Sequence, residues 1–133
     1  MSITMTLTSK MEGVGTAVLQ SVSKTGSGST NIREEIADSE TDLLVAFVAD
    51  ITQMKGLFIL SDQALTIKTN SSGEPQETIS LLAGVPLMWH DTLPNQADAN
   101  PFSDDITALY VTNASGETAN LTIAMLVDAT IDV

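Results

Sequence analysis

Apolar and polar residues alternate in short blocks along most of this chain. Ile3, Met5 and Leu7 alternate with serine and threonine, which is the period-two pattern of a strand with one apolar face. Residues 1–8 are therefore a first strand or an N-terminal arm. Similar blocks predict further strands at residues 14–22, 32–36, 43–48, 57–60, 65–69, 78–82, 87–90, 109–112 and 121–127. The pattern thus predicts about ten short strands.

Turn-forming residues separate several of these blocks. Residues 70–75 (NSSGEP) and 113–118 (NASGET) each contain Asn and Gly, which can adopt the positive φ angles that tight turns require. Both segments predict β-hairpins, and residues 23–30 (SKTGSGST) have the composition of a flexible loop. Many short strands joined by such turns predict an all-β fold, a jelly-roll-like antiparallel β-sandwich. The length of 133 residues fits a single domain, covering residues 1–133.

Residues 39–53 fit two patterns. Leu43, Leu44, Phe47 and Ile51 form the stripe of an amphipathic helix, with a serine at the candidate N-cap. The run LLVAFV within this segment fits a strand as well. Strand and helix both remain open here, and we favour the strand.

The run at residues 43–48 is apolar at both strand parities. A strand in a two-layer sandwich normally presents one face to water, so something should cover the second face here. Leu126 raises the same question, because it lies opposite in parity to its apolar neighbours, which are Leu121, Ile123, Met125 and Val127. The cover is either a loop of the same chain or a subunit interface, and the pattern leaves both open.

The interface interpretation gives a set of candidate partner-binding residues. An extended segment with alternating apolar residues can add a strand to the sheet edge of a neighbouring molecule. The apolar residues of the N-terminal segment are therefore candidates as well. In the run at 43–48 the sequence does not fix which parity faces a partner. The candidates are Ile3, Met5, Leu7, Val45, Phe47 and Leu126.

Charge and composition narrow the classes of partner. Five basic residues against 17 acidic ones give a formal net charge of -12, which repels a phosphate backbone, so no nucleic-acid partner is expected. No apolar run approaches the roughly 20 residues of a membrane span, so no membrane partner is expected either. The chain has no cysteine, and therefore no disulfide or thiolate metal site.

No motif of catalytic residues stands out. His90 is the only histidine and has Asp91 beside it, but no Gly-X-Ser-X-Gly nucleophile elbow completes a hydrolase triad. One group of acidic and amide side chains has the oxygen atoms that could bind calcium, but its spacing is not that of an EF-hand loop. This group comprises Asp98, Asn100, Asp104 and Asp105. We therefore expect no enzyme activity, no cofactor and no metal.

Four stretches between residues 50 and 128 carry a resemblance to a known family. They are KGLFILSD, LTIKTNSSGEPQETISLLAGVPLMW, NPFSDDITALYVTN and NLTIAMLVD, and the most telling pieces are residues 68–70, 85–89, 100–102 and 109–113. The segment resembles small virion proteins of tailed bacteriophages that act as capsid decoration, or cement, proteins. The resemblance implies a jelly-roll-like sandwich in the virion. It also implies a homotrimer that binds the major capsid protein on the outside of the phage head.

Two other classes of function share these features. A phage tail or baseplate component would show the same β-sandwich pattern. A carbohydrate-binding module would use aromatic residues such as Trp89 and Tyr110 to line a sugar site, and an exposed Trp89 would favour it. Trp89 follows Leu87 at strand spacing, so we expect the tryptophan to lie in the core.

Overall fold

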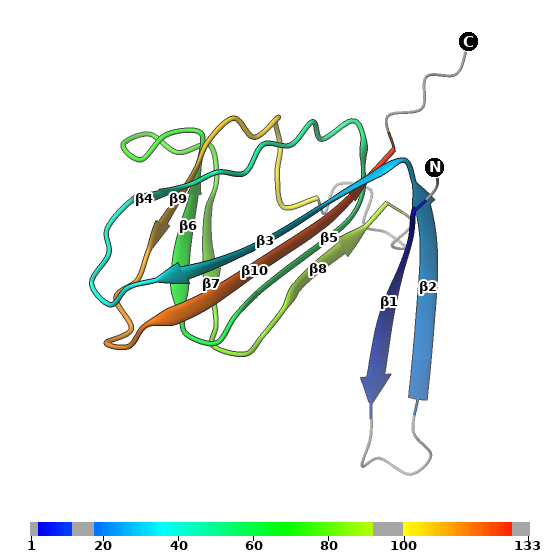
Figure 1. Ribbon diagram of the computed structural model, residues 1–133, viewed down its shortest axis with the longest axis horizontal. Helices are drawn as coiled ribbons and strands as arrows, with labels where there is room; N and C mark the ends of the chain where they lie inside the picture. Colours follow the sequence, from blue (N-terminus) through cyan, green and yellow to red (C-terminus); the bar gives the residue numbers. More distant parts are fainter. Residues whose placement is uncertain (1–2, 12–17, 92–99, 129–133) are drawn as a thin grey trace.

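The computed structural model of the protein describes residues 3–11, 18–91 and 100–128. Within them it contains ten β-strands and no helix, and all paired strands are antiparallel. Eight strands form two four-stranded sheets, and the first two strands form a separate hairpin (Figure 1). The all-β sandwich expected from the alternating pattern is therefore confirmed.

The order of the strands defines a jelly roll. The first sheet consists, in order, of β3 (Gly28–Ile36), β10 (Ala119–Val127), β5 (Met54–Ser61) and β8 (Leu87–His90). The second consists of β4 (Leu43–Val45), β9 (Leu109–Thr112), β6 (Leu65–Thr69) and β7 (Thr78–Leu81). The first and the last of these eight strands are neighbours, and consecutive strands lie in opposite sheets except for β6 and β7. This is the double Greek-key order of a jelly roll.

The hydrophobic core lies between the two sheets. In β6, β9 and β10 nearly every second side chain is buried, as the pleat of a strand requires. The register places Ile32, Ile123 and Ile59 side by side in the first sheet. Trp89 belongs to the buried cluster and is only 7% exposed. Its expected position in the core is therefore confirmed.

Residues 39–53 run along an edge of the second sheet and do not form a helix. β4 pairs with β9, and the chain then follows the same edge to a further bridge between Ala49 and Ile106. The strand interpretation is confirmed. The regular strand is shorter than expected, because it covers Leu43–Val45 and not the whole of residues 43–48.

Of the two predicted hairpins, one is confirmed and the other is wrong. Residues 70–75 join β6 to β7, which pair with each other. Residues 113–118 join β9 to β10, which lie in different sheets. The Asn and Gly residues mark a reversal of the chain in both places, but they do not determine whether the flanking strands pair or change sheets.

The glycine-rich segment at residues 23–30 is not a loop. It contains the end of β2 and the start of β3, with only Ser27 between them. A Cβ atom on Gly26 would overlap with the carbonyl oxygen of Val127, so the chain passes β10 too closely for a side chain at this position. The flexible-loop prediction is therefore wrong, because the glycine serves close packing.

The N-terminal segment forms a hairpin that leaves the sandwich. β1 (Ile3–Met11) and β2 (Val18–Gly26) pair with each other, and in the described part of the chain they pair with no strand of either four-stranded sheet. Figure 1 shows them extending beyond one end of the sandwich, away from β4. The predicted first strand is confirmed. The predicted second strand is shifted toward the C-terminus, and residues 14–17 lie outside the described residues.

Candidate interaction surfaces

The root of the N-terminal hairpin packs on the outer face of the first sheet. A Cβ atom on Gly56 of β5 would overlap with Cε of Met5 and lie 2.9 Å from its sulfur, so the methionine fills the space above this glycine. Ile3 and Met5 are half-buried. The side chain of Leu7 lies outside the described residues. Two of the three N-terminal candidates are thus partly covered by the chain itself.

Leu126 is covered by the same root. It is 1% exposed although it lies outside the main core cluster. Gly26 passes close to it, and a Cβ atom there would lie 3.0 Å from Cγ of Leu126. The cover that the sequence required is thus a segment of the same chain. Leu126 is not available to a partner in this fold, which corrects its place among the partner-binding candidates.

The edge that begins with β4 exposes a row of apolar side chains. Val45 and Phe47 are each 2% exposed and belong to the core, whereas Leu44 and Val48 are 61% and 70% exposed. Ala46 between them is exposed as well. The outward parity is therefore that of Leu44, Ala46 and Val48, and the choice of Val45 and Phe47 as partner-facing residues is corrected. We call the three exposed residues the β4 stripe.

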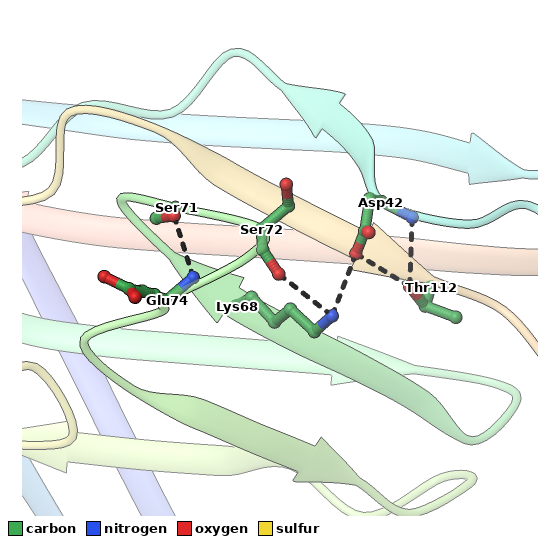
Figure 2. Close-up of polar contacts among 6 residues, drawn as sticks. All are labelled: Asp42, Lys68, Ser71, Ser72, Glu74 and Thr112. Atoms are coloured by element: carbon green, nitrogen blue, oxygen red, sulfur yellow. Dashed lines mark hydrogen bonds and ion pairs between the residues drawn. The ribbon is translucent and has the colours of Figure 1, made fainter.

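Polar contacts fix the backbone at the start of the β4 stripe. The backbone N–H of Asp42, just before β4, donates a hydrogen bond to Oγ1 of Thr112 on β9 at 3.0 Å. Nζ of Lys68 on β6 donates to Oδ1 of Asp42 at 3.2 Å and to the carbonyl of Ser72 at 3.3 Å (Figure 2). These contacts tie the edge strand to both β9 and β6. The backbone just before the β4 stripe is therefore held in place.

A smaller apolar site lies in the connection between β7 and β8. Leu82 and Val85 are 64% and 51% exposed. Gly84 has a φ of 71° and its N–H donates to the carbonyl of Ser61 at 2.8 Å, which fixes the turn between them. The sequence does not single out these two residues as an exposed pair, because Leu82 continues the pattern predicted for the strand at 78–82 and Val85 lies in a turn without a period.

The acidic residues considered as metal ligands hold loops together. Oδ2 of Asp104 accepts a hydrogen bond from Nε2 of Gln76 at 2.7 Å, and Oδ1 of Asp105 accepts one from the backbone N–H of Ile51 at 3.0 Å. Asp98 lies outside the described residues. Among the residues that the structure describes, no group of three histidine or carboxylate side chains could hold a metal ion.

A cavity of about 490 Å³ lies beside Trp89 at one end of the sandwich. Its wall includes the ion pair between Lys55 and Asp91, whose charged atoms are 3.4 Å apart. Nε1 of Trp89 is buried and has no hydrogen-bond partner among the described residues. The indole belongs to the core, so Trp89 lacks the exposed face that would favour a carbohydrate site. His90, the candidate triad histidine, is also buried, at 8% exposed.

Comparisons with known proteins gave no relative. A scan against protein-family models, a search of curated proteins and a search of solved structures each found no match to this chain. Within the described residues, no helix is long and apolar enough to cross a membrane. The function is therefore inferred from the residues and surfaces of the chain itself.

Replacing Gly56 with valine should loosen the root of the hairpin. The new side chain would occupy the place of Met5, which must then leave its contact. We expect trypsin to cleave after Lys10 and Lys24 several-fold faster, because local opening governs proteolysis. Gly73→Val is the matched control, since a Cβ atom at Gly73 meets no atom within 4 Å. Equal cleavage of the two variants would contradict the packing of Met5 on Gly56.

Lowering the pH should weaken the sandwich through Asp62. The backbone N–H and Nδ2 of Asn120 donate hydrogen bonds to its carboxylate at 2.8 Å and 2.9 Å, and they hold the pKa of Asp62 below its ordinary value of 3.8. The pKa of Asp62 is lower in the folded protein than in the unfolded chain. The hydrogen bonds to its carboxylate therefore stabilise the fold at any pH above the unfolded pKa, and this stabilisation is lost as the pH falls through the folded pKa. Between about pH 5 and about pH 2.5 the urea midpoint should fall, and it should fall less in Asp62→Asn. An equal fall in both proteins would count against this contribution.

Proposed function

We propose that this protein is a capsid decoration, or cement, protein. In this role it is a non-catalytic virion protein that binds the outside of a tailed-bacteriophage head as a homotrimer and bridges copies of the major capsid protein. One observation carries the proposal: a single small domain presents both a projecting hairpin and, elsewhere on its surface, the apolar β4 stripe. Two separate surfaces on one small domain suit a bridging molecule better than one that acts through a single pocket.

The fold and the sequence add support of different kinds. Jelly rolls occur in viral capsid proteins and also in lectins and cupins, so the architecture alone does not select a function. The resemblance of residues 50–128 to phage decoration proteins favours a capsid role over the roles of lectins and cupins. The formal net charge of -12 would keep the protein soluble and away from the phosphates of the packaged genome.

The energetics of a bridging role require only modest contacts. A decoration protein present in many copies stabilises a shell through many simultaneous contacts, because each further contact on the same particle forms at a high effective concentration. The β4 stripe presents three side chains and the hairpin a narrow ribbon. Neither is large enough for one tight site, and both suit repeated weak contacts.

The test is the stability of phage particles with and without the protein. Particles that lack it should release their DNA at a lower temperature than complete particles, and adding the purified protein should restore the release temperature. Cryo-electron microscopy of the complete particle should show density for it on the outside of the head. Equal release temperatures, or density only at the tail, would overturn the proposal in favour of a tail or baseplate component.

A further inference from the structure

The cavity beside Trp89 has the size and the lining of a small-molecule site. It lies where β5 begins and β8 ends, and its volume is about 490 Å³. Small-molecule sites occupy roughly 300–1,000 Å³ and are lined mainly by apolar and aromatic side chains. Met54, Trp89 and Phe102 belong to the wall of this cavity and are all buried. They give it an apolar inner side, against which the carbon skeleton of a small molecule can pack.

Hydrogen bonds within the chain hold the wall of the cavity in place. The backbone N–H of Asp91 donates to the carbonyl of Lys55 at 3.3 Å, which continues the pairing of β8 with β5. On the opposite side of the sequence gap, Oγ of Ser103 donates to Oε2 of Glu77 at 2.6 Å. The cavity is therefore formed before a ligand enters, which lowers the ordering cost of binding.

The indole of Trp89 brings an unused hydrogen-bond donor to this wall. Its Nε1 is the one buried side-chain nitrogen or oxygen atom without a hydrogen-bond partner among the described residues. Leaving a buried donor without an acceptor is costly, and a buried tryptophan N–H usually has a partner. An acceptor held in the cavity against the indole would supply this partner.

The polar part of the wall offers both donors and acceptors. It consists of Thr52, Lys55, Asp91, Asn100 and Ser103. Their hydroxyl, ammonium, carboxylate and amide groups include every kind of hydrogen-bonding partner. A hydroxyl group on a ligand both donates and accepts, so it can pair with any of them. The wall therefore suits a ligand that carries several hydroxyl groups.

The charges at the cavity favour an uncharged ligand. The two charged groups of the wall pair with each other, because Nζ of Lys55 lies 3.4 Å from Oδ2 of Asp91. The formal net charge of -12 repels anions from the chain as a whole. A cation would have to compete with Lys55 for Asp91. A neutral molecule meets neither obstacle.

We propose that this cavity binds a single ring of a neutral sugar. The hydroxyl groups of the sugar pair with the polar wall, one of its oxygens accepts from Nε1 of Trp89, and its C–H groups pack against Met54 and Phe102. The indole acts through its N–H edge, so the site needs no exposed aromatic face on which a sugar would stack. The inference goes beyond the proposed function and does not depend on it, because it requires neither a capsid nor an oligomer.

The fluorescence of Trp89 provides the first test, because it is the single tryptophan of the chain. The purified protein is titrated to millimolar concentrations with glucose, galactose, mannose, rhamnose, N-acetylglucosamine and N-acetylgalactosamine. Saturation-transfer NMR on the same samples detects binding that leaves the emission unchanged. We expect a saturable response to at least one sugar and none to glycerol, which has hydroxyl groups but no ring. No response to any of the sugars in either measurement, or an equal response to glycerol, would overturn the inference.

A pair of lysine variants places the binding at this cavity. Lys55→Met removes an ammonium group from the wall and keeps most of the side-chain volume, so the affinity for the sugar should fall several-fold. Lys68→Met is the matched control, because Lys68 forms an ion pair of similar exposure with Asp42, at 3.2 Å, and lies outside the wall. It should bind the sugar as the unaltered protein does. Equal affinities in the two variants would overturn the assignment of the site.

Trp89→Phe tests the indole donor itself. Phenylalanine keeps an aromatic ring in the core and removes Nε1, so the affinity measured by saturation-transfer NMR should fall roughly three- to tenfold, with an unchanged circular dichroism spectrum. An unchanged affinity would overturn the role of the indole N–H. Should this variant fail to fold, Lys55→Met keeps the test valid, because the side chain of Lys55 is partly exposed and does not belong to the core.

Discussion

Replacing Phe47 with alanine should lower the free energy of unfolding by about 3–5 kcal/mol, because a buried aromatic side chain leaves a cavity that its neighbours fill only in part. Phe47 is 2% exposed, and its ring lies 6.3 Å from that of Phe102, centroid to centroid, at an interplanar angle of 48°. The loss is a large fraction of the total stability of a small domain, which is about 5–15 kcal/mol. Urea or guanidinium denaturation measures it directly.

The adjacent residue supplies the control for this prediction. Val48 is 70% exposed, so Val48→Ala should change the free energy of unfolding by less than about 0.5 kcal/mol. The two substitutions are one position apart along the same edge, and the opposite burial of the two side chains is the main reason for the difference in their effects. Similar losses in both variants would mean that the parity found at this edge is wrong.

The sequence predicts an apolar edge at residues 43–48, but it does not predict which of these side chains face the core and which face outward. Alternation identifies the inward face wherever one parity is polar, as in β6, where Leu65 and Ile67 are buried and the polar residues Thr66 and Lys68 are partly exposed. In LLVAFV both parities are apolar. The register with β9 decides between them, because it sets Val45 opposite the fully buried Leu109. That pairing joins residues far apart in the sequence, and a local pattern does not contain it.

The jelly roll was predictable as a class, but the sheet to which a strand belongs was not. The turn at residues 113–118 resembles a hairpin turn in composition, yet β9 and β10 lie in different sheets. β10 pairs with β3 and β5 instead, and these partners precede it by more than fifty residues. Turn chemistry describes the local reversal of the chain, while long-range pairing determines the topology.

Gly26, which allows close packing, was predicted to be part of a flexible loop. Gly26 and Gly56 lie where the hairpin root meets the first sheet, and a side chain at either would overlap with an atom from a distant part of the sequence. A glycine within an alternating strand pattern is the sequence signal for such an approach. Gly56 carried that signal within KGLFILS. The signal marks a close approach without naming the partner, so the cover of Leu126 could not be assigned beforehand.

The side chain of Asn113 holds the corner between the two sheets. It is fully buried, and its Nδ2 donates hydrogen bonds to the carbonyls of Ile36, Ala37 and Glu117 at 3.0 Å, 3.2 Å and 2.8 Å. Its Oδ1 accepts hydrogen bonds from the backbone N–H and the hydroxyl of Ser115 at 3.0 Å and 2.7 Å. One amide therefore joins the end of β3 to the turn that leads into β10.

Asn113→Ala should lower the free energy of unfolding by about 2–4 kcal/mol, because each buried polar group left without a partner costs about 1–3 kcal/mol and water reaches only some of them. Asn113→Asp should be at least as harmful, since it removes the Nδ2 donors and adds a buried charge. Asn120→Ala is the control, because Asn120 is exposed and its side chain donates to the exposed Asp62. Denaturant midpoints of the three variants measure the difference. If Asn113→Ala and Asn120→Ala unfold at the same midpoint, the corner is held by its backbone hydrogen bonds and not by this amide.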